Sequence, residues 1–470
     1  MHKIINLSYF IPLLLILLST SCNQQHQSEK LHIDMIIEAD HILTMNASNT
    51  ILENSAIAIN DGLIIDIDNI EKINIKYKTN NRIFGENKIA LPGLVNGHSH
   101  AAMTLLRGIA DDRSLIDWLN NYIFPLEQQF VDAEFVRIGT ELACWEMIRG
   151  GTTTFVDMYF YPEVISKVVD SCGIRGLISS TVSDNQTPNA KNAEDAINGG
   201  EDYINRWLQK SPLITPILGP HAIYSLNLEQ LKETRRIASL TNTPISIHLS
   251  ESEFELEYSN QTYGMTSIEA LDSIDFFNGK TIAAHVVWPT ENEIAILAER
   301  NVGVIHNPTS NMKLASGVAP IKDMMDAGIL IGLGTDGAAS NNDLDMWEEM
   351  RLAALLQKVT QMNPEVLPAI SILKMATTNG AKILGLEKKI GKLEIGMNAD
   401  IIQVAFDDVH HQPNYDITSH LVYVTDEQDV VTVIVNGKLL MHEGRFFTLD
   451  TKKISEEVAA IATKISNSIN

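Results

Sequence analysis

The chain has 470 residues, which is long for one domain and normal for a barrel joined to a smaller sandwich. Its formal net charge of −24 argues against nucleic-acid binding, which requires basic surfaces. No Cys-x-x-Cys pair occurs, which excludes the zinc deaminase design built on His-x-Glu and paired cysteines, and the sequence does not decide whether Cys144 and Cys172 pair in an oxidising compartment.

Residues 1–22 have the pattern of a bacterial lipoprotein signal. A short basic start precedes an apolar run from about Phe10 to Leu18, shorter than the roughly 20 residues of a spanning helix, and small residues precede Cys22. Ser19 stands where a lipobox usually has leucine, so a plain secretory signal or an uncleaved anchor is the alternative. We therefore expect an exported periplasmic or cell-surface protein with a lipid on Cys22 and a polar tether at residues 23–32.

Two flanking segments, residues 33–90 and 389–450, have the same sequence pattern of short strand-like stretches separated by Asn, Asp and Gly. Segments of similar strand pattern can pair, so we expect both flanks to build one small β-sandwich. A helical stretch at 363–384 leads towards the second flank, and residues 451–470 are expected to form a terminal helix.

Strand-like and helical segments alternate between the flanks, from residue 91 to residue 388. The first strand is the apolar run from Ile89 that ends at His100, and seven more follow. This alternation predicts an α/β fold, a (β/α)₈ barrel with right-handed crossovers. The later strands are expected at 152–158, 175–182, 213–221, 244–249, 280–287, 302–308 and 329–336, and the helices at 132–149, 163–171, 193–209, 228–241, 264–271, 291–300 and 320–327.

Four of these strands end in residues that can bind a metal. His98 and His100 are two residues apart, so their side chains point to the same side of the first strand. The fifth strand delivers His248, the sixth His285 and the eighth Asp336. Each alone is as well explained by a core histidine or a turn aspartate, but a parallel barrel gathers these strand ends at one mouth. Imidazoles with one carboxylate suit zinc or ferrous iron.

From residue 32 onwards the chain resembles the amidohydrolase superfamily, and within it the branch of 5'-methylthioadenosine/S-adenosylhomocysteine deaminases and triazine hydrolases. His-x-His and Gly-Thr-Asp mark the whole superfamily, whereas HNPTSN and the long segment after the eighth strand are more specific to this branch. The segments that carry the resemblance are LPGLVNGHSHAAMTLLRG (91–108), FPLEQQF (124–130), GGTTTFVDMYFY (150–161), GPHAIYS (219–225), IHLSES (247–252), IAAHVVW (282–288), HNPTSNMKLASGVAPI (306–321) and GLGTDGAASNNDLDMWEEMRLAALLQK (332–358).

The resemblance implies one divalent metal, Zn²⁺ or alternatively Fe²⁺, held by His98, His100, His248 and Asp336. Binuclear relatives bridge two ions with a lysine or acid on the fourth strand, and the segment at 213–221 has neither. The ion would supply a metal-bound hydroxide near neutral pH. That hydroxide would deaminate an adenine nucleoside (5'-methylthioadenosine, S-adenosylhomocysteine or adenosine) to the inosyl product and ammonia.

Catalytic roles follow from the same resemblance. Glu251 would shuttle protons to the ring, although acidic neighbours at 253, 255 and 257 also allow a plain surface glutamate. His285 would orient the attacking water, and Asp336, besides ligating the metal, could take its proton.

Glu127 and His221 match family residues that hold ribose hydroxyls, and Trp118 is either a pocket wall or a core residue. Some relatives place arginines after the third strand, but none occurs here between positions 175 and 206, which favours a neutral nucleoside. The alternatives are a ring aminohydrolase or chlorohydrolase acting on a triazine, pyrimidine or guanine, or a non-catalytic surface lipoprotein that binds metal or nucleoside. A homo-oligomer is compatible with the sequence.

Overall fold

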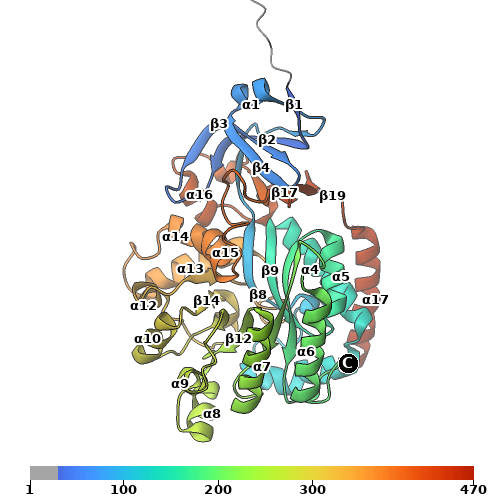
Figure 1. Cartoon of the computed structure of the whole chain (residues 1–470), viewed down its shortest axis with the longest axis vertical. Helices are drawn as coiled ribbons and strands as arrows, with labels where there is room; N and C mark the ends of the chain where they lie inside the picture. Colours follow the sequence, from blue (N-terminus) through green and yellow to red (C-terminus); the bar gives the residue numbers. More distant parts are fainter. Residues whose placement is uncertain (1–29, 470) are drawn as a thin grey trace, which may run out of the picture.

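The computed structural model describes residues 30–469. The expected signal segment, Cys22 and residues 23–29 of the expected tether lie outside this range. A barrel forms the larger body, and a smaller β-domain is stacked on one of its ends (Figure 1). Within residues 30–469, no helix is both long and apolar enough to cross a membrane.

Eight parallel strands form the barrel in sequence order, which confirms the predicted (β/α)₈ architecture. Most of their residues are buried, because helices cover the outside and side chains fill the inside. The eighth strand returns to the first, where the Asp336 amide donates to the His98 carbonyl at 3.0 Å. The strands are β8 (Leu94–Ser99), β9 (Thr152–Tyr159), β10 (Arg175–Val182), β11 (Ile214–Pro220), β12 (Ile245–Leu249), β13 (Thr281–His285), β14 (Gly303–His306) and β15 (Ile331–Leu333).

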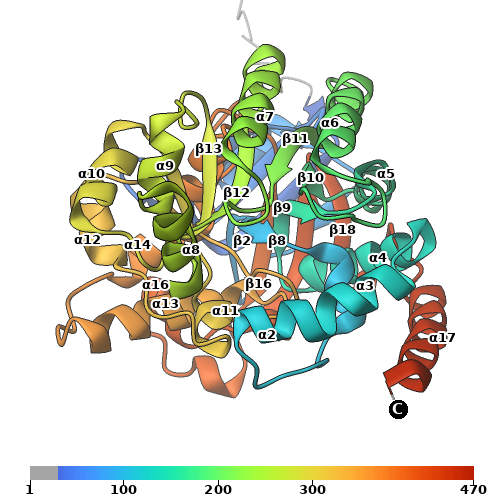
Figure 2. The ribbon, with the colours of Figure 1, turned by 90° about the horizontal axis from the view of Figure 1, so that it is seen from below.

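Helices surround the strands, as the view along the barrel shows (Figure 2). Several begin at side-chain caps, such as Asn227 before α7 and Thr290 before α10, each part of a capping box. The predicted helices appear as α4 (Ala133–Arg149), α5 (Pro162–Cys172), α6 (Ala193–Trp207), α7 (Leu228–Thr241), α9 (Ser267–Ser273), α10 (Glu291–Glu299) and α12 (Ile321–Asp326), with α14 (Ala369–Lys374), η3 (Met375–Asn379) and α15 (Gly380–Ile383) within 363–384.

Helical segments that the sequence pattern does not predict lie mainly in the loops after the strands. They matter for the site, because loops at that end of a barrel carry the chemistry. They are η1 (Ala101–Leu106), α2 (Leu115–Trp118), η2 (Leu119–Ile123), α3 (Phe124–Phe130), α8 (Glu253–Tyr263), α11 (Pro308–Lys313) and α13 (Met346–Thr360).

The two flanks pair into one nine-stranded sheet. Antiparallel pairing of β7 with β16, from Ile401 opposite Pro92 to Ala405 opposite Lys88, joins them. Two small helices, α1 (Ile70–Lys76) and α16 (Ile417–Tyr423), and the short pair β1 (Leu31–His32) and β5 (Tyr77–Lys78) complete this domain. The strands are β2 (Met35–Leu43), β3 (Ile51–Asn60), β4 (Leu63–Asn69), β6 (Arg82–Ile83), β7 (Lys88–Pro92), β16 (Ile401–Ala405), β17 (Val430–Val435), β18 (Lys438–His442) and β19 (Arg445–Phe446).

The apolar run predicted as one first strand is two strands. Its first part, β7, belongs to the flank sheet, and its second part, β8, belongs to the barrel. The chain changes sheets at Gly93, where an added Cβ would lie 2.1 Å from the Thr153 side chain. Both halves are buried, so hydrophobicity alone does not reveal the break.

A buried ion pair ties the flank sheet to the starting ends of the barrel strands. Arg175, the first residue of β10, donates from Nε and Nη2 to the Asp400 carboxylate at 3.1 Å each. Asp400 also accepts from the Asn436 amide at 2.7 Å. The flank domain therefore closes the end of the barrel opposite the strand tips.

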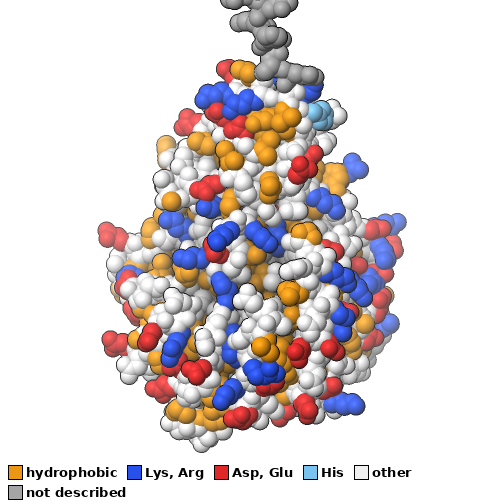
Figure 3. Space-filling view, viewed as in Figure 1, with side chains coloured by type: hydrophobic (Ala, Val, Ile, Leu, Met, Phe, Trp, Pro, Cys, Tyr) orange, Lys and Arg blue, Asp and Glu red, His pale blue; other side chains and the backbone are white. Residues whose placement is uncertain are grey.

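The terminal helix α17 (Thr451–Ile469) packs along α4 on the outside of the barrel (Figure 1). Cys144 on α4 and Cys172 at the end of α5 are both free and buried, and the nearby Cys172 together with burial raises the pKa of the Cys144 thiol. On the face shown in Figure 3, acidic and basic side chains are interspersed over both domains.

Candidate active site

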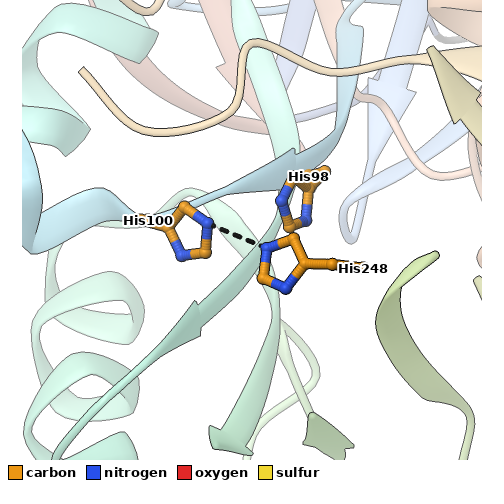
Figure 4. Close-up of side chains that lie close together, drawn as sticks. All are labelled: His98, His100 and His248. Atoms are coloured by element: carbon orange, nitrogen blue, oxygen red, sulfur yellow. Dashed lines mark hydrogen bonds between the residues drawn. The ribbon is translucent and has the colours of Figure 1, made fainter. Parts of the chain in front are cut away.

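Three histidines and one aspartate converge at the strand tips of the barrel. His98 and His100 come from β8 and the residue after it, His248 from β12, and Asp336 from just beyond β15. The three imidazoles face one another (Figure 4), with 3.3 Å between Nε2 of His100 and Nε2 of His248. Asp336 Oδ1 lies 3.4 Å from His98 Nε2 and 3.1 Å from His100 Nε2.

Main-chain carbonyls orient two of these rings. His100 Nδ1 donates to the Met158 carbonyl at 2.6 Å, and His248 Nδ1 donates to the His221 carbonyl at 2.8 Å. A carbonyl only accepts, so Nδ1 of each ring carries a hydrogen, and Nε2 of each ring is directed towards the centre. This arrangement is the usual support of a metal-binding histidine.

Two serines hold the other oxygen of Asp336. Oδ2 accepts from Ser310 at 2.7 Å and from Ser340 at 2.8 Å, which leaves Oδ1 directed at the histidines. The backbone of Asp336 has a φ of +63°, a left-handed conformation that is uncommon outside glycine. The sequence does not mark either serine as a support of Asp336, because Ser310 lies 26 residues before it and Ser340, four residues after it, is an ordinary loop residue by its local sequence.

The donor set fits a divalent metal. Ligands bound to zinc at about 2.0–2.1 Å with tetrahedral angles lie roughly 3.3 Å apart, which matches the three spacings between 3.1 and 3.4 Å. Both ring nitrogens of the fully buried His98 lack a hydrogen-bond partner. Buried polar atoms without partners are rare, so an imidazole without a hydrogen-bond partner that faces a carboxylate fits the role of a metal ligand.

Electrostatics also favour a cation here. Burial lowers the pKa of His98 to about 4 and holds the pKa of His248 well below its usual value, so these rings are neutral ligands. Burial acts against protonation of His100 too, but the hydrogen bond and charge of Asp336 outweigh it and raise its pKa to about 9. The carboxylate therefore holds one positive charge at this point, a place that a divalent ion can take.

His285 and Glu251 stand beside the ligands. His285 Nδ1 donates to Asn311 Oδ1 at 2.8 Å, which turns Nε2 towards Glu251 Oε2 at 3.9 Å. Burial raises the pKa of Glu251, so its carboxyl keeps a proton more readily than an exposed glutamate. These two residues can hold and pass protons next to the metal site.

Glu255 is a buried carboxylate to which the sequence assigns no role, and it is one of the acidic neighbours of Glu251. It lies on α8 and is fully buried. Its Oε1 accepts from the Ser250 amide at 2.8 Å, and its Oε2 accepts from the Glu251 amide at 3.1 Å. Burial raises the pKa of Glu255 to about 7. Glu255 thus fixes the turn that carries Glu251.

An inner cavity of about 80 Å³ opens in front of the ligands. Glu127 on α3 accepts from the Tyr159 hydroxyl at 2.7 Å, and burial raises its pKa to about 7. His221 Nδ1 lies 3.1 Å from Ser225 Oγ, and burial lowers its pKa to about 4. Trp118 is 6% exposed and lines the same cavity, so it is a buried core residue that also forms part of the cavity wall.

A larger cavity of about 470 Å³ continues outwards past Glu127 and His221. The loop after β10, residues 185–188, forms one side of it, and Phe254 and Ser183 contribute elsewhere. Among the described residues, neither cavity is lined by a lysine or an arginine. The outer cavity therefore offers neutral polar and apolar contacts, with the acid Glu127 at its inner end.

The structure brings nearly all the sequence-predicted site residues into one place, and Cys22 alone lies outside the described residues. Those that line the inner cavity are His100, Trp118, Glu127, His221, His248, Glu251, His285 and Asp336, and His98 is buried among the ligands.

This chain resembles known proteins in sequence and in structure over almost its whole length. The amidohydrolase family matches residues 89–440. A 5-methylthioadenosine/S-adenosylhomocysteine deaminase of Thermodesulfovibrio yellowstonii is 41% identical over 92% of this chain and 99% of that protein. A 5'-deoxyadenosine deaminase of Methanosarcina mazei is 41% identical over 93% of this chain and 99% of that protein. The crystal structure of an adenosine deaminase from Xanthomonas campestris with bound zinc has a TM-score of 0.91 and 33% identity, covering 93% of this chain and all of that one.

Proposed function

The chain belongs to the amidohydrolase family, and on this basis we propose that it deaminates neutral adenine nucleosides, replacing the amine at C6 by oxygen and releasing ammonia. The observation that carries the proposal is one continuous site. A metal-ligand set, a buried proton-carrying glutamate and the pair Glu127 and His221 line the same cavity.

Deamination needs a nucleophile and a carrier for protons. His98, His100, His248 and Asp336 would hold a divalent ion, zinc or ferrous iron, which would supply the nucleophile by lowering the pKa of water towards neutrality. Glu251 supplies the carrier, since its pKa is raised by burial.

Proton transfer accompanies the attack at C6. Glu251 gives a proton from its carboxyl to N1 of the ring as oxygen adds to C6, and takes up the proton that the water loses. The same carboxyl then protonates the departing amine, so water and nucleoside yield the inosyl product and ammonia. His285 Nε2, held towards Glu251 by Asn311, orients the reacting oxygen.

Ribose recognition falls to Glu127 and His221. Tyr159 occupies Oε1 of Glu127, and Oε2 is left to accept a sugar hydroxyl. The low pKa of His221 keeps its ring neutral, so Nε2 can share a hydrogen bond with the adjacent hydroxyl. A vicinal diol next to the ring is a feature of nucleosides and not of free bases or triazines.

The outer cavity supports the preference for an uncharged 5' end. A homocysteine carboxylate placed there would find no cationic partner among the lining residues. A methylthio, methyl or hydroxyl group is neutral and needs none. We therefore favour 5'-methylthioadenosine, 5'-deoxyadenosine and adenosine over S-adenosylhomocysteine.

A substrate panel on the purified, metal-analysed protein tests this proposal. The absorbance change from adenine to hypoxanthine should follow addition of the neutral nucleosides. S-adenosylhomocysteine should have a kcat/KM at least about tenfold lower, because a charged group loses the hydrogen bonds of water without replacement. Ammonia release from guanine, cytosine or a triazine, with no turnover of any adenine nucleoside, would overturn the proposal in favour of a ring hydrolase of another kind.

We propose in addition that the N-terminal segment exports the enzyme and that a lipid on Cys22 anchors it. The first described strand, β1, lies at the far end of the flank domain, away from the barrel mouth (Figure 1), so an anchor there would leave the mouth open to the surroundings. Washed intact cells should then deaminate added nucleoside, and a Cys22→Ser variant should release the activity from the membrane. Activity that appears only after lysis would contradict export.

A further inference from the structure

A second group of metal-binding side chains lies in the flank domain. His410 and His411 belong to the short helix η4 (Val409–His411), which follows β16, and Asp429 ends the short helix η5 (Glu427–Asp429), which leads into β17. One oxygen of Asp429, Oδ2, is 3.1 Å from His410 Nε2 and 3.5 Å from His411 Nε2. Ligand atoms of all three residues lie within 4.8 Å of one another.

These spacings resemble those of the active site. There the ligand atoms are separated by 3.1 to 3.4 Å, and tetrahedral zinc requires roughly 3.3 Å. Two imidazoles and one carboxylate are also a zinc-type donor set, and they leave a fourth position open.

His411 is the residue that an ordinary ion pair does not explain. It is fully buried, and neither of its ring nitrogens has a hydrogen-bond partner. A simple pair of His410 with Asp429 satisfies the exposed His410 and leaves His411 orphaned beside the same carboxylate. Buried polar atoms without partners are rare in folded proteins, so this one points to a ligand.

Two of the three side chains, His411 and Asp429, are held in place by contacts outside the cluster. The Phe406 ring stacks on His411, with centroids 4.3 Å apart and an interplanar angle of 14°. The Asp426 amide donates to Asp429 Oδ2 at 2.9 Å, which fixes that carboxylate. The site is therefore formed before any ion arrives, and its exposed side, at His410, gives an entry path.

We infer that His410, His411 and Asp429 form a second binding site for a divalent transition metal of the zinc class, separate from the catalytic one. The bound ion would link the segment after β16 to the segment before β17 and so cross-link the return strands of the flank domain. The inference does not depend on the proposed reaction.

Metal counting on the intact enzyme tests the site. After dialysis against micromolar zinc, the unchanged protein should retain about two ions per chain, one at each ligand set. His410→Gln changes an exposed ligand and should retain about one ion while keeping full deaminase activity, which reports a filled catalytic site and an intact fold. Asp429→Asn should behave in the same way. Asp407→Asn removes a charge from the same segment at an exposed position outside the ligand set, and should still hold two.

Three results would overturn the inference. The first is a fully active, unchanged enzyme that binds only one zinc per chain at saturation. The second is retention of two ions by both ligand variants. The third is loss of an ion by the Asp407→Asn control together with His410→Gln, which would indicate a general charge effect and not a defined site.

Discussion

Glu255 offers the sharpest test of how the fold holds the catalytic glutamate. Replacing it by alanine leaves the Ser250 and Glu251 amides without an acceptor inside a closed region. Each unsatisfied buried group costs about 1–3 kcal/mol, so Glu255→Ala should lower the free energy of unfolding by about 2–6 kcal/mol. Glu255→Gln retains one accepting oxygen and should lose about half as much.

Turnover should fall more than binding in these variants. A shift of about 1 Å in a catalytic group can cost about a hundredfold in rate, and the turn that Glu255 fixes carries Glu251. We expect kcat to fall between tenfold and a hundredfold in Glu255→Ala, with a near-normal KM and full metal content. Denaturant unfolding, steady-state kinetics and metal analysis measure these three quantities. The exposed Glu257→Ala on the same helix is the control. If Glu255→Ala unfolded like the unchanged protein and turned over within about twofold of it, the positioning role would be wrong.

Three further predictions concern other parts of the molecule. Glu251→Gln should bind metal normally by elemental analysis and lose most of its turnover, whereas near-normal turnover would rule out the proton shuttle. Arg175→Ala should destabilise the protein by about 3–5 kcal/mol in denaturant, because it leaves Asp400 buried and unpaired, while the kcat of the folded fraction should stay unchanged. Burial raises the pKa of Asp345 to about 7 from an ordinary value near 4, so the folded state holds this proton more tightly than the unfolded state. The contribution of Asp345 to the free energy of unfolding therefore falls as the pH rises from about 4 to about 7. Asp345→Asn keeps a helix cap and should therefore gain stability relative to the unchanged protein by about 1–3 kcal/mol between pH 5 and pH 8, measured by denaturant unfolding at each pH.

The barrel could be predicted because its strands are continuous apolar runs separated by helical segments. Two of the missed features arise where a buried polar group or a second sheet changes the pattern. In α8 the two fully buried positions are occupied by polar residues, Glu255 and Ser259, so the apolar spacing of an amphipathic helix is interrupted. Between Ile89 and Val95 the residues are buried in both sheets. The hydrophobic pattern therefore does not show that the chain leaves the flank sheet and enters the barrel at Gly93.

The ligands could be predicted because strand ends are local features of the sequence. The residues that support the ligands could not be predicted, because their contacts depend on how the loops fold and not on a local pattern. Ser310 and Ser340 reach Asp336 from the loops after β14 and β15, and Asn311 reaches His285. Hydroxyl and amide residues are common in loops, so nothing in their local sequence separates a support from an ordinary turn residue.

The backbone at the mouth shows why chemistry and stability are kept at opposite ends of this barrel. His285, Ser250 and Asp336, all at strand ends beside the site, have φ values of +75°, +51° and +63°. Such conformations cost of order 1–3 kcal/mol each and persist only where surrounding contacts fix them. They let a strand end turn its side chain inwards while the chain leaves the barrel. The contacts that stabilise the fold lie at the opposite end, where the flank sheet packs on the starts of the strands and Arg175 pairs with Asp400. A substitution that relaxed the strained residues would therefore stabilise the chain at the expense of the ligand geometry.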